Sequence, residues 1–179
     1  MKLSRLTLQL GILLFITTIA LFLTLFFVFS TNGQMTEADY FNYSSLINCF
    51  LMPPIFAGVG FYSAYSQAKK QSLSFSQGFK YAFFPQFIGG LLGLGFIFIF
   101  FNTIGSWAED SLQRGWYDLM VQNPNPEFME ANKEFIKGMT DMSHNLFTFR
   151  NFTIAFMIIL FFYVLISTIF AVFLRNRNI

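Results

Sequence analysis

The side chains that most often carry chemistry are scarce in this chain. Its 179 residues include one histidine, His144, and one cysteine, Cys49. A single cysteine excludes intramolecular disulfides and multi-cysteine metal sites, and His144 has no His or Cys companion in its segment with which to hold a metal. We expect Cys49 to be a small buried hydrophobic residue. The sequence therefore predicts neither a metal site nor a cofactor.

Nucleophiles and proton carriers are equally poor candidates. Hydroxyl groups within apolar stretches, such as those of Thr18 and Ser167, most often hydrogen-bond to their own helix backbone. The middle of these stretches contains no Asp, Glu, Lys or Arg, so a nucleophile would lack a base and a proton relay would lack its groups. We expect Gln86 and Asn102 to form interhelical or backbone hydrogen bonds, with a ligand cavity as the alternative for Gln86. The chain is predicted not to be an enzyme, and it has neither a phosphate loop nor a basic patch for nucleic acid.

The composition shows which solvent surrounds the chain. Hydrophobic residues make up 55% of it and charged residues 11%, whereas soluble domains carry about 25% charged residues. The 28 phenylalanines exceed what one small core can bury. Four apolar stretches reach the length of about 20 residues that a bilayer core requires. We predict an all-α membrane four-helix bundle as a single domain over 1–179, with spans at about 8–30, 43–67, 82–104 and 152–174.

The first stretch begins like a secretory signal peptide, with Lys2 and Arg5 before an apolar run. That run is longer than the roughly 7–15 apolar residues of a signal peptide, and no small-residue cleavage site or lipobox cysteine follows it. We therefore interpret it as an uncleaved signal anchor.

The second and third stretches contain residues suited to helix packing. Pro53 and Pro54 remove backbone donors, which predicts a kink near Leu51–Pro54 whose freed carbonyls pack against protein. Small residues follow, among them Gly58 and Gly60. Gly89 and Gly93 form a GxxxG spacing, which lets helix backbones approach closely.

The charges are strongly segregated along the chain. In the two ends and in the connection between spans two and three, every charged residue is basic: Lys2, Arg5, Lys69, Lys70, Lys80, Arg175 and Arg177. The other two connections contain all nine acidic residues and four basic ones. Because cytoplasmic segments are rich in Lys and Arg, we predict that both termini lie in the cytoplasm and that 105–150 lies outside.

The connection 105–150 is too long for a turn. Ser106 and Glu109 fit a capping box at a helix start, and Asn125 with Pro126 fits the start of a second, amphipathic helix. The favoured interpretation is that these helices pack on each other or on the membrane surface. The alternative is a docking surface for protein or lipid, with five candidate residues: Trp107, Trp116, Phe128, Phe135 and Met139.

A short segment before the third span has its own helical pattern. Phe75, Phe79 and Phe83 recur every four residues, which predicts a short interfacial helix leading through Pro85 into span three.

The order of these features resembles a known family. It comprises an anchor span, a kinked second span, the basic turn Ala68–Gln71, the Ser-Phe-x-x-Gly-Phe-Lys stretch at Ser74–Lys80, a Gly-rich third span, an amphipathic loop and a last span with a basic end. It resembles the bacterial domain-of-unknown-function family 4199. The resemblance implies a four-helix protein of a Gram-negative inner membrane and brings no activity or site residues with it.

Three functions remain open at this level. The first is a non-catalytic accessory or scaffold subunit of a larger assembly of integral membrane proteins. The alternatives are a small channel or transporter, built around Pro53–Pro54 and the third-span glycines, and a protein that binds lipid in an aromatic groove.

Overall fold

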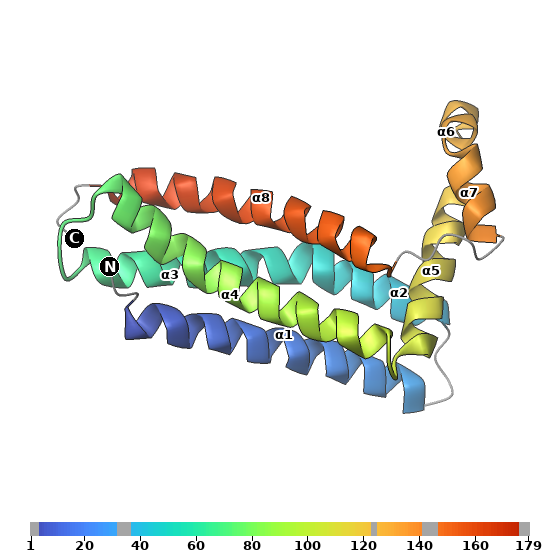
Figure 1. The fold of residues 1–179 in the computed structure, drawn as a ribbon, viewed down its shortest axis with the longest axis horizontal. Helices are drawn as coiled ribbons and strands as arrows, with labels where there is room; N and C mark the ends of the chain where they lie inside the picture. The colour runs from blue at the N-terminus through green and yellow to red at the C-terminus, as the bar shows by residue number, and fades with distance from the viewer. Residues whose placement is uncertain (1–3, 32–36, 123–124, 141–146, 176–179) are drawn as a thin grey trace.

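The computed structural model describes residues 4–31, 37–122, 125–140 and 147–175. These residues form an all-α fold (Figure 1). Its elements in chain order are α1 (Arg5–Thr31), α2 (Glu37–Leu46), the π-helical turn η1 (Ile47–Leu51), α3 (Met52–Ala68), α4 (Phe75–Phe101), α5 (Ser106–Val121), α6 (Pro126–Ala131), α7 (Lys133–Thr140) and α8 (Phe149–Leu174).

Among the described residues, four helical segments are long and apolar enough to cross a membrane: Arg5–Phe29, Ala38–Ala68, Phe75–Phe101 and Phe149–Leu174. In the most apolar stretch of each span, at most 33% of the residues are buried. Large apolar side chains such as Ile16, Ile158 and Val172 instead lie exposed on the outside of the bundle, where only lipid can cover them at low cost. The predicted all-α class and the multi-pass membrane architecture are confirmed.

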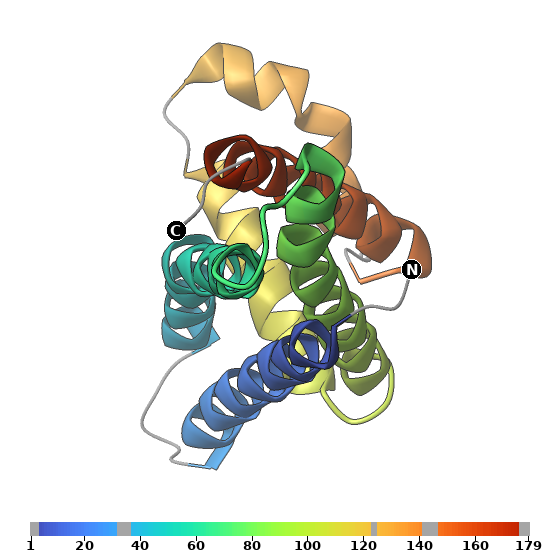
Figure 2. The ribbon, with the colours of Figure 1, turned by 90° about the vertical axis from the view of Figure 1, so that its left-hand side faces the viewer.

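The four spans run between two ends of the bundle (Figure 1). We call the end where α1 begins, α3 meets α4 and α8 finishes the terminal end. The opposite end, from which α5, α6 and α7 project, is the arm end, and these three helices are the arm. Helix α4 lies between the other spans and contacts α1, α3 and α8 (Figure 2).

Glycines on α4 let α1 approach closely. A Cβ atom at Gly89 would lie 2.5 Å from Leu14 Cβ and 3.2 Å from the Gly11 carbonyl oxygen. One turn later, a Cβ at Gly93 would lie 3.0 Å from Thr18 Cγ2. Without side chains at these positions, the two backbones gain close van der Waals packing, the main source of helix association in lipid.

The second span is a composite helix with an irregularity before its prolines. The N–H of Met52 donates to the Ile47 carbonyl, five residues back, which makes η1 a π-helical turn. Pro53 and Pro54 have no N–H to donate to the preceding turn, so the regular α-helical hydrogen bonds cannot continue there. The irregularity lies at Ile47–Leu51, one turn before the predicted kink.

Two predictions of helix starts were wrong. Helix α5 takes Gly105 as its N-cap, and no side chain caps it, so Ser106 is already the first helical residue. The capping box lies at Ser74, whose hydroxyl accepts from the Gln77 N–H while Gln77 Oε1 accepts from the Ser74 N–H. Helix α4 begins at this cap and continues through the buried Pro85. The segment around Phe75 and Phe79, predicted as a separate interfacial helix, is therefore the first part of α4.

Other features differ from the sequence prediction in position. Span two begins in α2, before residue 43, and span three ends at Phe101, because residues 102–104 form a turn. The arm's second helix is divided at Asn132, whose side chain donates to the Phe128 carbonyl at 2.8 Å. Cys49 is exposed in η1, where lipid can surround it, so its predicted burial was wrong.

Candidate functional site

A cavity of about 440 Å³ lies between the spans in the arm half of the bundle. Its volume falls within the roughly 300–1,000 Å³ of typical small-molecule sites. All four spans contribute to its wall, together with one residue from α5 and Phe147. The lining residues are Thr18, Leu21, Phe22, Leu25, Tyr40, Ser44, Ile47, Asn48, Met52, Pro53, Phe56, Gly90, Leu94, Ile97, Phe101, Leu112, Phe147, Ile158, Ile159, Phe162 and Tyr163.

Aromatic packing closes the cavity toward the terminal end. The rings of Phe56 and Tyr163 stack with their centroids 5.3 Å apart and their planes 4° from parallel. A Cβ at Gly90 would lie 2.9 Å from Tyr163 Cε2, so the glycine leaves the room that this ring occupies. Both aromatic side chains are buried and belong to one cluster with Leu14. This layer separates the cavity from the terminal half.

A second aromatic cluster holds the arm end together. Tyr40 lies 5.1 Å from Trp107 and 5.9 Å from Phe29, measured between ring centroids. Phe22 meets Phe100 and Phe101 edge-on at 5.1 Å and 5.5 Å. These contacts tie α1, α2, α4 and the base of α5 to one another, and they fix Tyr40 at the cavity wall.

The polar side chains of the second span follow one line along the wall. Tyr40, Ser44 and Asn48 are spaced by four residues, so they occupy one helix face, and all three line the cavity. Asn48 Nδ2 donates to the Ser44 carbonyl at 2.9 Å. The Ser44 side chain lies beside the Tyr40 phenol, but its Oγ has no partner with hydrogen-bonding geometry among the described residues. We refer to Tyr40, Ser44 and Asn48 as the polar ladder.

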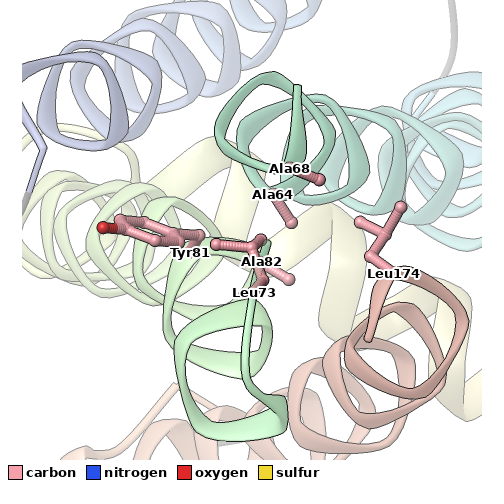
Figure 3. Close-up of a cluster of buried hydrophobic side chains, with 6 residues drawn as sticks. All are labelled: Ala64, Ala68, Leu73, Tyr81, Ala82 and Leu174. Atoms are coloured by element: carbon pink, nitrogen blue, oxygen red, sulfur yellow. The ribbon is translucent and has the colours of Figure 1, made fainter. Parts of the chain in front are cut away.

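The terminal half is packed quite differently. Its apolar cluster consists of three alanines, two leucines and one tyrosine from α3, α4, α8 and the connection between α3 and α4: Ala64, Ala68, Leu73, Tyr81, Ala82 and Leu174 (Figure 3). Gln86, fully buried beside it, donates through Nε2 to the Ala82 carbonyl at 2.9 Å and to Ser167 Oγ at 3.1 Å. Gly60 leaves the space for that amide, because a Cβ there would overlap Gln86 Nε2.

A family model described as "Protein of unknown function (DUF4199)" matches residues 9–176. The chain belongs to this family. No curated protein and no solved structure matches it significantly. The predicted resemblance to this family is confirmed, and the family description assigns no function to its members.

The residues predicted for helix packing in the DUF4199 chain have different surroundings. Gly60 meets Gln86, and Gly89 and Gly93 meet α1. A Cβ added at Gly58 would have no other side chain or helix within 4 Å among the described residues. Pro53 lines the cavity, but the neighbouring Pro54 is exposed. Gln86 does not line the cavity and instead joins α4 to α8.

The residues predicted for partner docking also separate. Trp107 is half-buried against Tyr40 and Phe26 and belongs to the bundle. Trp116 is 49% exposed on α5 and meets Phe41 edge-on at 6.3 Å. Phe128 is half-buried in α6. His144 and the side chains of Phe135 and Met139 lie outside the described residues.

Amide and hydroxyl side chains of the DUF4199 chain bond to helix carbonyls. Asn102 Nδ2 donates to the Phe98 carbonyl at 2.9 Å and reaches the Phe147 carbonyl at 3.5 Å. Thr18 and Thr168 donate to carbonyls four residues back in their own helices. The predictions for Asn102 and for these threonines are confirmed. The Ser167 hydroxyl, expected to bond in the same way, instead accepts from Gln86 Nε2 on α4. Within the part of the chain that the structure describes, no three His, Cys, Asp or Glu residues are grouped as a metal site would require.

Sequence reasoning did not find the cavity or the polar ladder. The spacing of Tyr40, Ser44 and Asn48 was a usable signal, because three polar residues on one face of a membrane span face protein or a cavity far more readily than lipid. This signal was missed because the second span was expected to begin at residue 43, which assigned Tyr40 to a loop.

Proposed function

We propose that this protein is a non-catalytic membrane protein that binds a lipid molecule in the cavity of its arm half. The observation that carries the proposal is the cavity itself, about 440 Å³ in volume and walled by all four spans. None of its lining residues, all drawn from the described part of the chain, is Asp, Glu, Lys, Arg or His. Such a wall favours an apolar occupant over an ion or a charged solute.

The surroundings supply the ligand. Four spans place the protein in a bilayer, where acyl chains are the most abundant apolar molecules. Ile158, which is 66% exposed, also lines the cavity, so the wall of the cavity is continuous with the lipid-facing surface on α8. A chain can therefore enter from the membrane without passing through water.

Native mass spectrometry of gently extracted protein tests lipid binding. We expect the wild type to retain one lipid, and Leu94→Trp, which fills the cavity, to retain at least tenfold less. Leu92→Trp is the matched control, because Leu92 lies two residues away on α4, is exposed, and does not line the cavity. A wild type without lipid, or equal retention in both variants, would overturn the proposal.

The orientation belongs to the same proposal. Arg5, Lys69, Lys70 and Arg175 lie at the terminal end, and acidic residues Glu109, Asp118 and Glu130 lie on the arm. Since cytoplasmic segments carry the basic excess, the terminal end lies in the cytoplasm and the arm lies in the periplasm of a bacterial inner membrane. The cavity then opens into the outer leaflet. Alkaline phosphatase fused after Gln122 should be active and fused after Gln71 inactive, whereas the reverse pattern would invert the orientation.

A second candidate is an accessory subunit of a membrane complex, and one observation favours it. Helix α5 is not among the four spans, yet Trp116, Leu119 and Val121 are 49%, 55% and 41% exposed on it. Apolar side chains in water favour a covering partner. Native mass measurement after mild extraction should then show a hetero-complex, which Leu119→Ser weakens. A monomer under several mild conditions would count against this function and leave lipid binding untouched.

The channel alternative gains less support from the geometry. A conducting path needs polar groups along its length, and the stacked Phe56 and Tyr163 rings close the cavity toward the terminal half. Ion or solute flux in proteoliposomes at rates above those of empty vesicles would revive it.

A further inference from the structure

The polar ladder suggests which kind of lipid the cavity takes. Ser44 is 4% exposed and lines the cavity. Its hydroxyl lies beside the Tyr40 phenol, but it has no partner with hydrogen-bonding geometry among the described residues. A buried hydroxyl in apolar surroundings is costly until it is paired. A ligand atom in the cavity can provide that pairing, so the unpartnered Oγ marks the place for a polar group.

The neighbouring ladder residues define the hydrogen-bonding pattern. The Ser44 and Tyr40 hydroxyls lie beside each other, and each can donate or accept. Asn48 Nδ2 donates one N–H to the Ser44 carbonyl, and its second N–H and its amide oxygen remain for other partners. The residue lines the cavity and is also exposed. A head group that both donates and accepts, such as a hydroxyl beside an ester, satisfies all three residues. A quinone offers only acceptors, so it could donate to neither the Ser44 nor the Asn48 oxygen.

The rest of the wall sets the charge and the body of the ligand. No charged residue or histidine is among the lining residues, which all belong to the described part of the chain, so a carboxylate or phosphate drawn inside would be unpaired and costly. Opposite the ladder's span, Leu94 and Ile97 on α4 and Ile159 and Phe162 on α8 provide apolar surface suited to an acyl chain. The polar and apolar parts of the wall thus match an uncharged amphipathic molecule.

We propose that the cavity binds a neutral lipid whose head carries a hydroxyl group, of the monoacylglycerol type, with its head on Tyr40, Ser44 and Asn48 and its chain against α4 and α8. This inference rests on the proposed function and adds the chemical class of the ligand. The ladder provides selectivity for the head group, and the apolar wall provides most of the affinity.

Competition binding on the purified, delipidated full chain tests the inference. Radiolabelled 1-monoolein is bound to the protein and displaced by unlabelled 1-monoolein, oleate, 1-octadecene or decylubiquinone. We expect 1-monoolein to compete at least tenfold better than the other three. Ser44→Ala should weaken 1-monoolein about fivefold, the loss of one hydrogen bond, and should leave 1-octadecene unchanged.

Ser45→Ala is the matched control, because Ser45 is the adjacent residue of α2 and does not line the cavity. It should bind all probes as the wild type does. Equal competition by all probes, preference for oleate or decylubiquinone, or an unchanged Ser44→Ala variant would overturn the head-group assignment. Those outcomes leave lipid binding itself standing, which is decided separately by the retained lipid of the wild type and its loss in Leu94→Trp.

Discussion

The terminal half and the arm half of the bundle are built from the same four spans and are packed in opposite ways. In the terminal half, Gly60, Ala64 and Ala82 let α3 and α4 approach closely, and the fully buried Gln86 side chain fills the space beside them. In the arm half, large aromatic residues meet edge-on and leave a cavity of about 440 Å³. The same four spans thus pack closely at one end of the bundle and leave a cavity at the other.

Buried polar groups sharpen this contrast. In the terminal half, Thr7 Oγ1 pairs with Ser63 Oγ at 3.3 Å, and Gln67 Nε2 donates to Ser4 Oγ at 3.3 Å. These bonds join α1 to α3 within the protein. In the arm half, the equally buried Ser44 hydroxyl has no partner among the described residues. Gln86 Oε1 in the terminal half also has no partner among the described residues, but its amide is held by two bonds through Nε2. Polar side chains of the terminal half therefore join helices to one another, whereas Ser44 joins none.

The largest expected effect comes from breaking the terminal half. Gly60→Ala places a Cβ against Gln86 and 2.9 Å from the Ala82 carbonyl oxygen, which should cost about 1–3 kcal/mol of stability by overpacking. Gly58→Ala is the control, because the space at its Cβ is open and alanine favours the helix by up to about 1 kcal/mol. In thermal unfolding in detergent, Gly60→Ala should have a lower midpoint temperature than the wild type, and Gly58→Ala should not. Equal midpoints would show that α3 and α4 are not closely packed there.

Filling the arm-half cavity should affect stability much less. Leu94→Trp replaces empty space with a side chain, so we expect its unfolding free energy in lipid-free detergent to stay within about 1 kcal/mol of the wild type. Added 1-monoolein at ten times its dissociation constant should stabilise the wild type by about 1.4 kcal/mol and the variant hardly at all. The same thermal assay measures both. A severe loss of stability in Leu94→Trp would mean that the arm half is packed as tightly as the terminal half.

The interhelical bond of Gln86 predicts a smaller effect. Ser167→Ala removes the hydroxyl that accepts from Gln86 Nε2 and should cost about 1 kcal/mol. Thr168→Ala removes a hydroxyl that bonds only to its own backbone, at the Val164 carbonyl, and should cost less. Chemical unfolding in mixed micelles can rank the two variants. A larger loss in Thr168→Ala would contradict the structural role given to Gln86.

Cys49 provides the mildest test, because it requires no substitution. It is exposed in η1, the turn that also carries Asn48, and it lies within a span surrounded by lipid. A water-soluble maleimide should therefore leave it unlabelled in intact membranes and label it after denaturation. Rapid labelling in membranes would indicate a water-filled arm half and would favour a channel.

The sequence predicted the four apolar helices well because hydropathy is recorded residue by residue. Four spans followed from apolar length, and Gln86 and Asn102 were recognised as hydrogen-bonding residues because amides at membrane depth must be paired. Helix starts were less predictable. Ser106 and Ser74 both precede a suitable N3 residue, and only the fold shows that Ser74 caps a helix while Gly105 takes that place before Ser106.

The cavity was beyond the reach of the sequence for a physical reason. Its shape depends on how Phe56, Tyr163 and Gly90 meet from three different helices, and a linear pattern does not contain that meeting. The apolar residues on the wall also look like any other membrane residues. Only the spacing of Tyr40, Ser44 and Asn48 was visible beforehand.

Photocrosslinking with a lipid carrying a diazirine on its acyl chain tests the central claim most directly. We predict that adducts in reconstituted protein concentrate on cavity-lining residues such as Leu94, Ile97 and Ile159, and that Leu94→Trp, but not Leu92→Trp, removes them. Adducts spread evenly over exposed residues such as Leu13 and Val172, with no effect of Leu94→Trp, would contradict a lipid site in the arm half.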